Sequence, residues 1–192
     1  MRIEKYTAVL KDGRTYGFKS IDVSEAEEML DLRYKTSQET DFLTRYPEEI
    51  LGTCVREFDS IKDAEKSERD VFLGAYDGER LIGSAHVFPI SKYQKFAHRC
   101  ELGILVSKDY WSRGVGKKLI IDAIKFAEEM GYTLMQLETF DKNERGIGLY
   151  EHMGFTRVGQ IPFGGLRKDG TYYEEVIMYK VLSKNANNNI KD

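Results

Sequence analysis

The sequence contains few cysteines and histidines, and this excludes several kinds of site. Two cysteines, Cys54 and Cys100, lie far apart, and none of the three histidines has neighbours at the spacing of metal ligands. We therefore expect no metal site, and we expect both cysteines to be reduced, structural thiols. Because neither cysteine has the surroundings of a nucleophile, a covalent enzyme intermediate is not expected.

The chain also lacks a strong net charge and a long apolar run. Its 29 basic and 32 acidic residues give a formal net charge of -3, which does not favour nucleic acid as a partner. No apolar stretch approaches the ~20 residues that cross a bilayer, and the opening residues 1–5 do not resemble a signal peptide. These absences predict a cytoplasmic protein that binds neither nucleic acid nor membrane.

What the sequence does contain is a glycine-rich turn between a strand and a helix. An apolar strand over Arg99–Val106 leads through Gly114 and Gly116 into an amphipathic helix over residues 116–130. The free N–H groups of a helix N-terminus favour an anion, and glycines let the backbone approach it closely. A tight turn without a ligand is the alternative. The spacing fits neither a dinucleotide fold nor a P-loop, because there is no third glycine and no Ser or Thr after Lys117.

A second segment, from Asn143 to Phe155, follows a predicted strand over residues 134–140. In this order and separation, the two segments resemble the two motifs of the GNAT acetyltransferase superfamily, and the resemblance covers roughly residues 20–182. The matching residues are Val106, Tyr110, Gly114 and Gly116 in V-x-P-x-[YF]-[RQ]-x-x-G-x-[GA], and Asn143, Leu149, Tyr150, Gly154 and Phe155 in N-x-x-A-x-x-L-Y-x-x-x-G-F.

Three residues depart from these motifs. Lys108 stands where the family often has Pro, Trp111 where it has Arg or Gln, and Gly146 where Ala is common. Since Trp111 has no guanidinium, Arg113 or Lys117 must provide any side-chain charge for the cofactor phosphates. Gly146 costs its helix up to about 1 kcal/mol relative to Ala.

The resemblance implies a single α/β (α+β) domain over residues 1–184. Its central sheet is mixed and mostly antiparallel, with helices on both faces and one parallel pair that splays apart at the cofactor site. The parallel pair is expected to be 99–106 with 134–140, because a helix connects these strands. An N-terminal hairpin is expected at about 6–21, and the polar residues 185–192 are expected to form a disordered tail.

Several element boundaries can also be predicted. Ser24 and Glu27 form the pattern of a capping box at a helix start. A polar helix is expected over 48–69, and a strand over 155–159. The resemblance places an acceptor-binding loop near Arg45–Glu49, although a proline at position 47 equally suits the first turn of a helix.

The resemblance implies cofactor contacts along both motifs, and these are expected at Leu105, Val106, Trp111, Arg113, Gly114, Val115, Gly116, Lys117, Asn143 and Tyr150. Tyr150 is expected to be the general acid, because a phenol with a pKa near 10 can return a proton to a thiolate of pKa near 8.5. The alternative is a tyrosine that only packs its helix. Asn143 is expected to bind the cofactor, and it also suits a helix N-cap.

The general base is less well defined by the sequence. Glu101, at the start of the key strand, is the first candidate, and Glu138, on the neighbouring strand, is the second. A solvated carboxylate, an ion pair of Glu101 with Arg99, and a water relay without a single base are the alternatives.

The resemblance implies an N-acetyltransferase that uses acetyl-CoA as co-substrate, without metal. The acceptor would be a primary amine of a small molecule or peptide, and a homodimer is possible in this family. An alternative function is that of a non-catalytic acyl-CoA-binding module. A nucleotide-binding fold is a third hypothesis. The sequence does not identify the amine.

Overall fold

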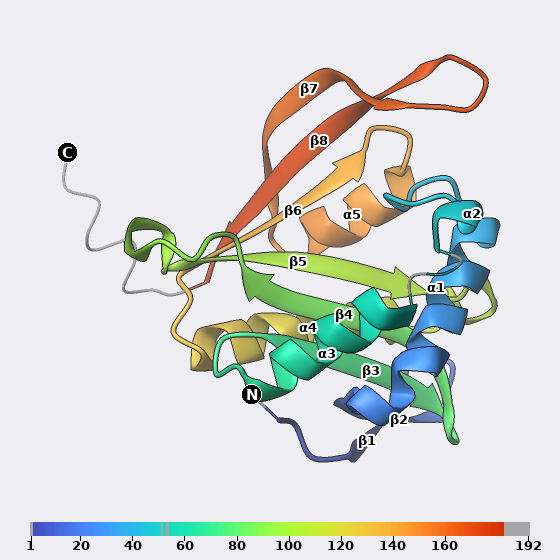
Figure 1. Cartoon of the computed structure of the whole chain (residues 1–192), viewed down its shortest axis with the longest axis vertical. Helices are drawn as coiled ribbons and strands as arrows, with labels where there is room; N and C mark the ends of the chain where they lie inside the picture. The colour runs from blue at the N-terminus through green and yellow to red at the C-terminus, as the bar shows by residue number, and fades with distance from the viewer. Residues whose placement is uncertain (1, 51, 53, 183–192) are drawn as a thin grey trace.

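The computed structural model describes residues 2–50, 52 and 54–182. A central sheet has helices on both of its faces (Figure 1). The strands are β1 (Tyr6–Val9), β2 (Thr15–Ser20), β3 (Val71–Asp77), β4 (Arg80–Pro89), β5 (Arg99–Val106), β6 (Leu134–Phe140), β7 (Thr156–Leu166) and β8 (Tyr172–Val181). The α-helices are α1 (Ala26–Glu39), α2 (Pro47–Ile50), α3 (Cys54–Lys66), α4 (Val115–Glu129) and α5 (Glu144–His152).

The strands lie in the order β1-β2-β3-β4-β5-β6-β8-β7. Every neighbouring pair is antiparallel except β5 with β6, which is parallel. Helix α4 connects these two strands, and a crossover of this kind is what a parallel pair requires. The expected fold class, a mixed and mostly antiparallel sheet with one parallel pair and helices on both faces, is confirmed, as is the N-terminal hairpin.

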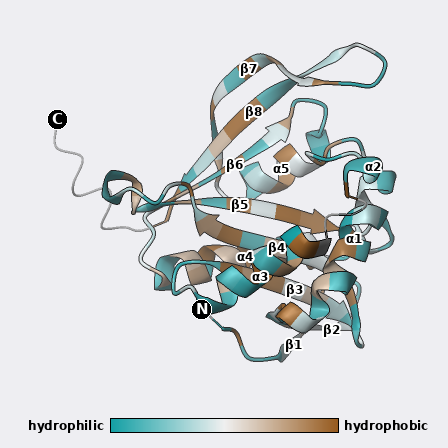
Figure 2. Ribbon diagram, in the orientation of Figure 1, coloured by the Kyte–Doolittle hydropathy of each residue, from teal (hydrophilic) through white to brown (hydrophobic). Residues whose placement is uncertain are grey.

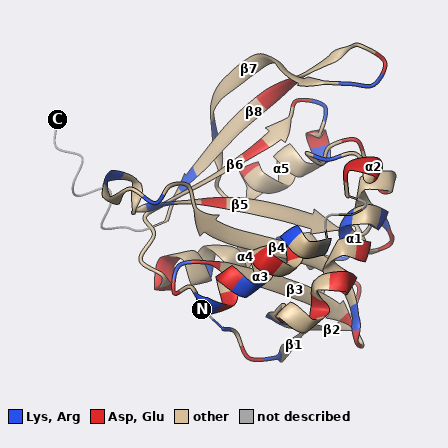
Figure 3. Ribbon diagram, viewed as in Figure 1, with Lys and Arg blue, Asp and Glu red and all other residues tan. Residues whose placement is uncertain are grey.

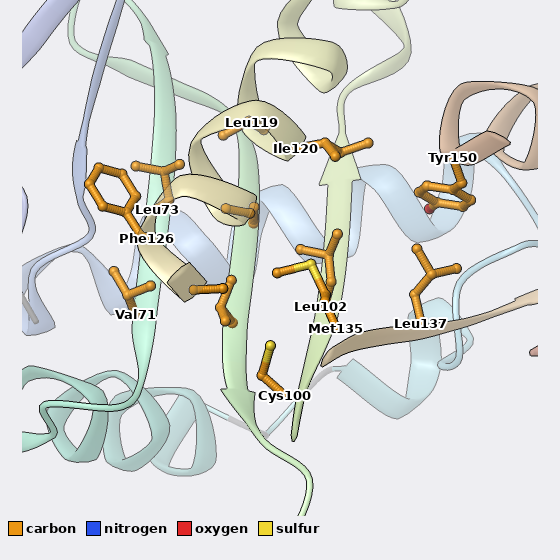
Figure 4. Close-up of a cluster of buried hydrophobic side chains, with 14 of the residues drawn as sticks. Val71, Leu73, Cys100, Leu102, Leu119, Ile120, Phe126, Met135, Leu137 and Tyr150 are labelled. Carbon is orange, nitrogen blue, oxygen red and sulfur yellow. The ribbon is translucent and has the colours of Figure 1, made fainter. Parts of the chain in front are cut away.

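Each face of the sheet has its own apolar core, because side chains alternate along a strand. On one face, α4 and α5 pack on the strands, and Figure 4 shows side chains of α4 above those of β5 and β6. On the other face, Met29 of α1 and Ile61 of α3 pack with Phe72 and Leu105. Figure 2 shows the hydrophobic residues concentrated on the central strands between these helices. Within the described residues, no helix combines the length and apolarity needed to cross a membrane.

The face that carries α1 and α3 is only partly covered. Helix α1 contacts β4 and β5, and α3 contacts β3. The strands β6, β8 and β7 continue the sheet beyond these helices, and the β7–β8 hairpin projects from it (Figure 1). This leaves an open face over β5, β6 and β8.

Three predicted boundaries were wrong. The capping box lies earlier than Ser24: the N–H of Asp22 donates to Glu25 Oε2 at 2.9 Å, and a 3-10 turn over Val23–Glu25 precedes α1. Asp is as good an N-cap as Ser, and Glu25 stands at the right distance from it. The polar helix expected over 48–69 is instead two helices, because Gly52 has φ 81°, a left-handed conformation that ends a helix.

The third difference concerns β7, which continues past the expected end at 159 to Leu166. Its pairing with β8 shifts register between Arg157 and Gly159 and again between Ile161 and Gly165. Such bulges, together with its position at the sheet edge, let this strand accommodate Pro162 and its glycines. Pro47 begins α2, which agrees with the interpretation of this segment as a helix start. The predicted tail, 185–192, lies outside the described residues.

Candidate active site

The parallel strands β5 and β6 separate at the centre of the sheet. Their pairing consists of Arg99 with Leu134, Cys100 with Met135 and Glu101 with Gln136. Both strands continue beyond this point, β5 to Val106 and β6 to Phe140, without pairing to one another. We call the space between these unpaired ends the β5–β6 gap.

The register of β5 shows which backbone groups face the β5–β6 gap. Ser107 N–H donates to the Ile82 carbonyl at 2.9 Å, so these residues form a hydrogen-bonded antiparallel pair. Hydrogen-bonded pairs alternate along such strands. The backbone of Leu105 therefore points toward β4, whereas the N–H and C=O groups of Ile104 and Val106 point into the gap. Ile104, which was not expected at the site, presents its backbone there in place of Leu105.

Helix α4 begins beside this gap with a shaped turn. Gly114 is its N-cap and has φ 100°, a conformation that favours glycine. The first bond of the helix runs from Lys118 N–H to the Gly114 carbonyl at 2.9 Å. The N–H groups of Val115, Gly116 and Lys117 precede that bond, so they point out of the helix end. This end carries the positive pole of the helix dipole.

The glycines of this turn lie close to their neighbours. A Cβ added at Gly116 would meet Leu149 Cδ2 at 3.5 Å and Val106 Cγ2 at 3.8 Å. A Cβ at Gly114 would stand 3.4 Å from the backbone nitrogen of Lys11, in the β1–β2 turn. The start of α4 is thus held between α5, β5 and the β1–β2 turn.

Two expected phosphate ligands have protein partners. The Nη1 atom of Arg113 lies 3.8 Å from Asp12 Oδ2, and its guanidinium lies 5.2 Å from the ring centroid of Tyr110. The ammonium of Lys117 lies 3.2 Å from His152 Nε2. Arg113 therefore points toward the β1–β2 turn, and Lys117 points toward the end of α5.

Trp111 contacts the backbone at the end of β5. Its indole N–H donates to the carbonyl of Val106 at 2.7 Å, so it occupies one of the backbone groups that the gap exposes. The guanidinium of Arg145 lies 4.8 Å from the centroid of the same indole. Arg145, in the first turn of α5, was not expected at the site, and no local pattern in the sequence distinguishes it.

Tyr150 lies on the inner face of α5 with only 8% of its surface exposed. Its ring packs edge-on against Phe155 with centroids 6.1 Å apart, and Figure 4 shows it beside Leu137 at one end of the core. Burial raises the pKa of Tyr150 to about 12, because a phenolate would be poorly solvated there. The hydroxyl therefore stays protonated at any physiological pH.

Asn143 is the N-cap of α5. Its Oδ1 accepts the N–H of Gly146 at 3.1 Å, and its Nδ2 donates to Thr139 Oγ1 at 3.0 Å. A Cβ at Gly146 would lie 2.4 Å from Nδ2, so this rotamer of Asn143 needs glycine at 146. The glycine that departs from the family pattern therefore has a structural reason.

Three carboxylates lie on the open face, and Figure 3 shows acidic segments on β5, β6 and β8 there. Glu101 pairs with Gln136 across β5 and β6, and Phe140, two residues beyond Glu138, pairs with Glu175. Burial and then the charge of Glu138 raise the pKa of Glu101, against the effect of a hydrogen bond from Gln136. Burial and the neighbouring Glu138 also raise the pKa of Glu175. The carboxylates repel one another, and a cation placed among them would relieve this.

One alternative expected an ion pair between Arg99 and Glu101, but Arg99 instead contacts Gln136. The Nη2 atom of Arg99 donates to Gln136 Oε1 at 2.6 Å. This leaves the NH₂ group of Gln136 for the Glu101 carboxylate, and Gln136 lowers the pKa of that group.

Tyr46, just before α2, and Glu48, within α2, contact the β7–β8 hairpin. The hydroxyl of Tyr46 donates to the Leu166 carbonyl at 3.2 Å, and Lys168 Nζ lies 2.5 Å from Glu48 Oε1. Below this connection, the ring of Tyr173 packs against Phe140 at 4.6 Å between centroids. These contacts give the open face an aromatic wall at the end where β5 and β6 separate.

Cys100 lies in the core, and Figure 4 shows it below Met135 and away from Tyr150. Burial raises the pKa of its thiol to about 12, so it is a poor nucleophile. The expectation of a free, structural thiol is confirmed for Cys100. The side chain of Cys54 lies outside the described part of the chain.

Comparison with known proteins identifies relatives for most of the chain. The Acetyltransferase (GNAT) family matches residues 24–155. N-acetyltransferase aca1 of Schizosaccharomyces pombe is 26% identical over 176 residues, which is 84% of this chain and 84% of that protein. The chain spans about half the length of the first curated relatives it matches, 55% and 40% of two rat N-acetyltransferases.

Solved structures share the fold. An acetyltransferase of the GNAT family from Streptococcus pneumoniae superposes with a TM-score of 0.82 and 23% identity, over 86% of this chain and 99% of that one. The yncA structure from Salmonella typhimurium, solved with its cofactor acetyl-CoA, gives a TM-score of 0.78 and 17% identity, over 87% and 94% of the two chains.

Proposed function

Because the chain belongs to the GNAT family of acetyltransferases, we propose that it transfers the acetyl group of acetyl-CoA directly to a primary amine. The observation that carries this proposal is the β5–β6 gap. It exposes the backbone of Ile104 and Val106 beside the N-terminus of α4 and the buried hydroxyl of Tyr150. An acyl group bound there would meet hydrogen-bond donors on one side and carboxylates on the other.

The residues around the gap suit coenzyme A. The N–H groups of Val115, Gly116 and Lys117 would hold the diphosphate, since they point out of a helix end that favours negative charge. The exposed backbone of Ile104 and the N–H of Val106 would bond to the amide groups of the pantetheine arm and to the acetyl oxygen. Acetyl-CoA, when bound, supplies the thioester carbon that the amine attacks.

The side chains around the gap would then have separate roles. Glu101, on the open face, would accept the proton that makes the amine a free nucleophile. After the attack, the second proton on nitrogen would pass to the departing thiolate, to which Tyr150, on the opposite face, would donate a hydrogen bond. A lysine-like amine has a pKa near 10.4 and arrives as a cation, so the carboxylates of Glu138 and Glu175 would attract it before Glu101 deprotonates it.

The proposed base has a testable pH dependence. Glu101 must be ionised to accept a proton, so kcat/KM should rise as pH passes the pKa of this group, which burial raises from its ordinary value. Glu101→Gln should remove this rise and lower kcat by about 10²-fold. Glu138→Gln should move the rise to lower pH, because the charge that raises the pKa is gone. Initial rates between pH 5 and 9 measure both effects.

Controls separate the two candidate bases. Glu174→Gln changes an exposed carboxylate on the same strand as Glu175 and should leave the profile unaltered. Loss of activity in Glu138→Gln but not in Glu101→Gln would make Glu138 the base, and full activity in both would favour a water relay. Since the folded-state pKa of Glu101 is raised, its ionised form destabilises the fold as pH rises. Glu101→Gln should therefore have a higher Tm at pH 7, which shows that it is folded.

The activity itself is tested by release of free CoA thiol from acetyl-CoA in the presence of a panel of primary amines. Thiol release that depends on one class of amine supports the proposal. Binding of coenzyme A in calorimetry, with no release for any amine, would favour a non-catalytic acyl-CoA-binding module. Thermal stabilisation by NAD or ATP but not by coenzyme A would point to a nucleotide as the ligand of this site.

The cytoplasmic location and the homodimer stay predictions. For a homodimer, the edge strand β7 offers a surface, because Val158, Phe163 and Leu166 are exposed to 56%, 74% and 61%. Apolar side chains that gather on one hairpin and are this exposed are typical of a surface that contacts another protein.

A further inference from the structure

The turn before α4 lacks the arginine or glutamine that the family motif has at position 111. The two other cations of that turn face elsewhere, Arg113 toward Asp12 at 3.8 Å and Lys117 toward His152 at 3.2 Å. A diphosphate at the α4 N-terminus would meet neither side chain as the structure holds them. A guanidinium from another element contacts the side chain of Trp111.

Arg145 is that group, and two contacts fix it. Its guanidinium carbon lies 4.8 Å from the centroid of the Trp111 ring, and its Nη2 donates to Ser112 Oγ at 2.9 Å. Arg145 is otherwise exposed, and no carboxylate pairs with it among the described residues. A guanidinium has five N–H donors, so most of them stay available to a ligand.

The backbone of the turn is also adapted to this contact. Ser112 has φ 61°, a left-handed conformation that is uncommon for residues other than glycine. Such strain persists where the surroundings fix it, and it gathers at binding sites. Ser112, two residues before Gly114, combines this strained backbone with a hydroxyl that accepts a hydrogen bond from Arg145. The loop and the first turn of α5 thus hold one guanidinium next to the α4 N-terminus.

We propose that Arg145, stacked on Trp111 and bonded to Ser112, is the guanidinium that binds the diphosphate of coenzyme A in this chain. The inference rests on the proposed acetyl-CoA site. In it, an arginine on the following helix replaces the one missing from the turn, and the indole provides a flat surface for it. Arg145 and Tyr150 belong to the same helix, so α5 would carry both the group that binds the diphosphate and the hydroxyl that bonds to the sulfur.

The test is the affinity for coenzyme A in calorimetry. Arg145→Ala should weaken binding by about 10- to 100-fold, the usual effect of losing a hydrogen bond to a charged group. Dephospho-CoA keeps the diphosphate but lacks the 3′-phosphate. Arg145→Ala should weaken the binding of dephospho-CoA by the same factor as the binding of coenzyme A. Arg157→Ala removes another exposed arginine, which pairs with Glu151 at the end of α5, and should bind normally.

A second variant makes the test specific. Trp111→Arg combined with Arg145→Ala returns a guanidinium to the turn and should recover most of the lost affinity. A loss seen with coenzyme A but not with dephospho-CoA would assign Arg145 to the 3′-phosphate and overturn the proposal. So would normal affinity of Arg145→Ala while the wild type binds coenzyme A. If the wild type itself does not bind coenzyme A, the proposed function fails instead.

Discussion

Replacing Tyr150 by phenylalanine should lower kcat by about 10²-fold and leave the affinity for coenzyme A nearly unchanged. The ring would keep its place against Phe155, and only the hydroxyl would be lost. With a pKa of about 12, this phenol cannot fully transfer its proton to a thiolate of pKa near 8.5 at low cost. Its contribution is therefore a hydrogen bond to the charge that develops on sulfur, which is typically worth about 1.5–3 kcal/mol.

The pH profile distinguishes this role from a packing role. Because burial raises the pKa of Tyr150, its deprotonation should cause no decline in kcat between pH 8 and 10. Tyr172→Phe, which changes a tyrosine that is 53% exposed on β8, is the matched control. Unchanged kcat in Tyr150→Phe would remove this residue from the mechanism and leave it a core tyrosine.

Replacing Gly114 by glutamate should weaken coenzyme A binding by about 100-fold or more, the second large effect. Two causes act together. A side chain at φ 100° costs about 1–2 kcal/mol, so the turn would shift from the conformation that points its N–H groups at the diphosphate, and the carboxylate would repel the diphosphate at the helix end. Each 1.4 kcal/mol is a factor of ten in affinity. Calorimetry at two salt concentrations measures the effect and its electrostatic part.

Two further variants separate these causes. Gly114→Gln has the same bulk without the charge, so the difference from Gly114→Glu reports the repulsion alone. Gly131→Glu bears a similar backbone cost, at φ 81° beyond the other end of α4, with open space around it. It should lose stability but bind coenzyme A normally. Wild-type affinity in Gly114→Glu would show that the α4 N-terminus does not hold the diphosphate.

Much of the fold could be predicted because its signals are local. Asp-Gly turns mark the hairpins, helical periodicity marks α4, and the crossover between β5 and β6 requires a parallel pair. The misplaced boundaries arose where two signals compete. Asp22 and Ser24 are both good caps, and Gly52 interrupts a segment whose polar pattern continues across it.

The candidate site was less predictable, because it is assembled across strands and loops. The motifs predict roles for Gly114, Asn143 and Tyr150, but they do not predict which backbone groups of β5 face the gap. That depends on the register with β4, which the structure supplies and which favours Ile104 over Leu105. Glu175 joins Glu101 and Glu138 only because β8 inserts between β6 and β7. Arg145 reaches Trp111 across two elements, and no spacing in the sequence reveals this contact.

The early end of pairing between β5 and β6 has a consequence for the order of events. Helices α4 and α5 lie on one side of the sheet and the carboxylates on the other. On the proposed function, thioester and amine would approach a shared opening from opposite sides, so neither obstructs the path of the other. On that function both substrates would be held at once, as a direct transfer between them requires.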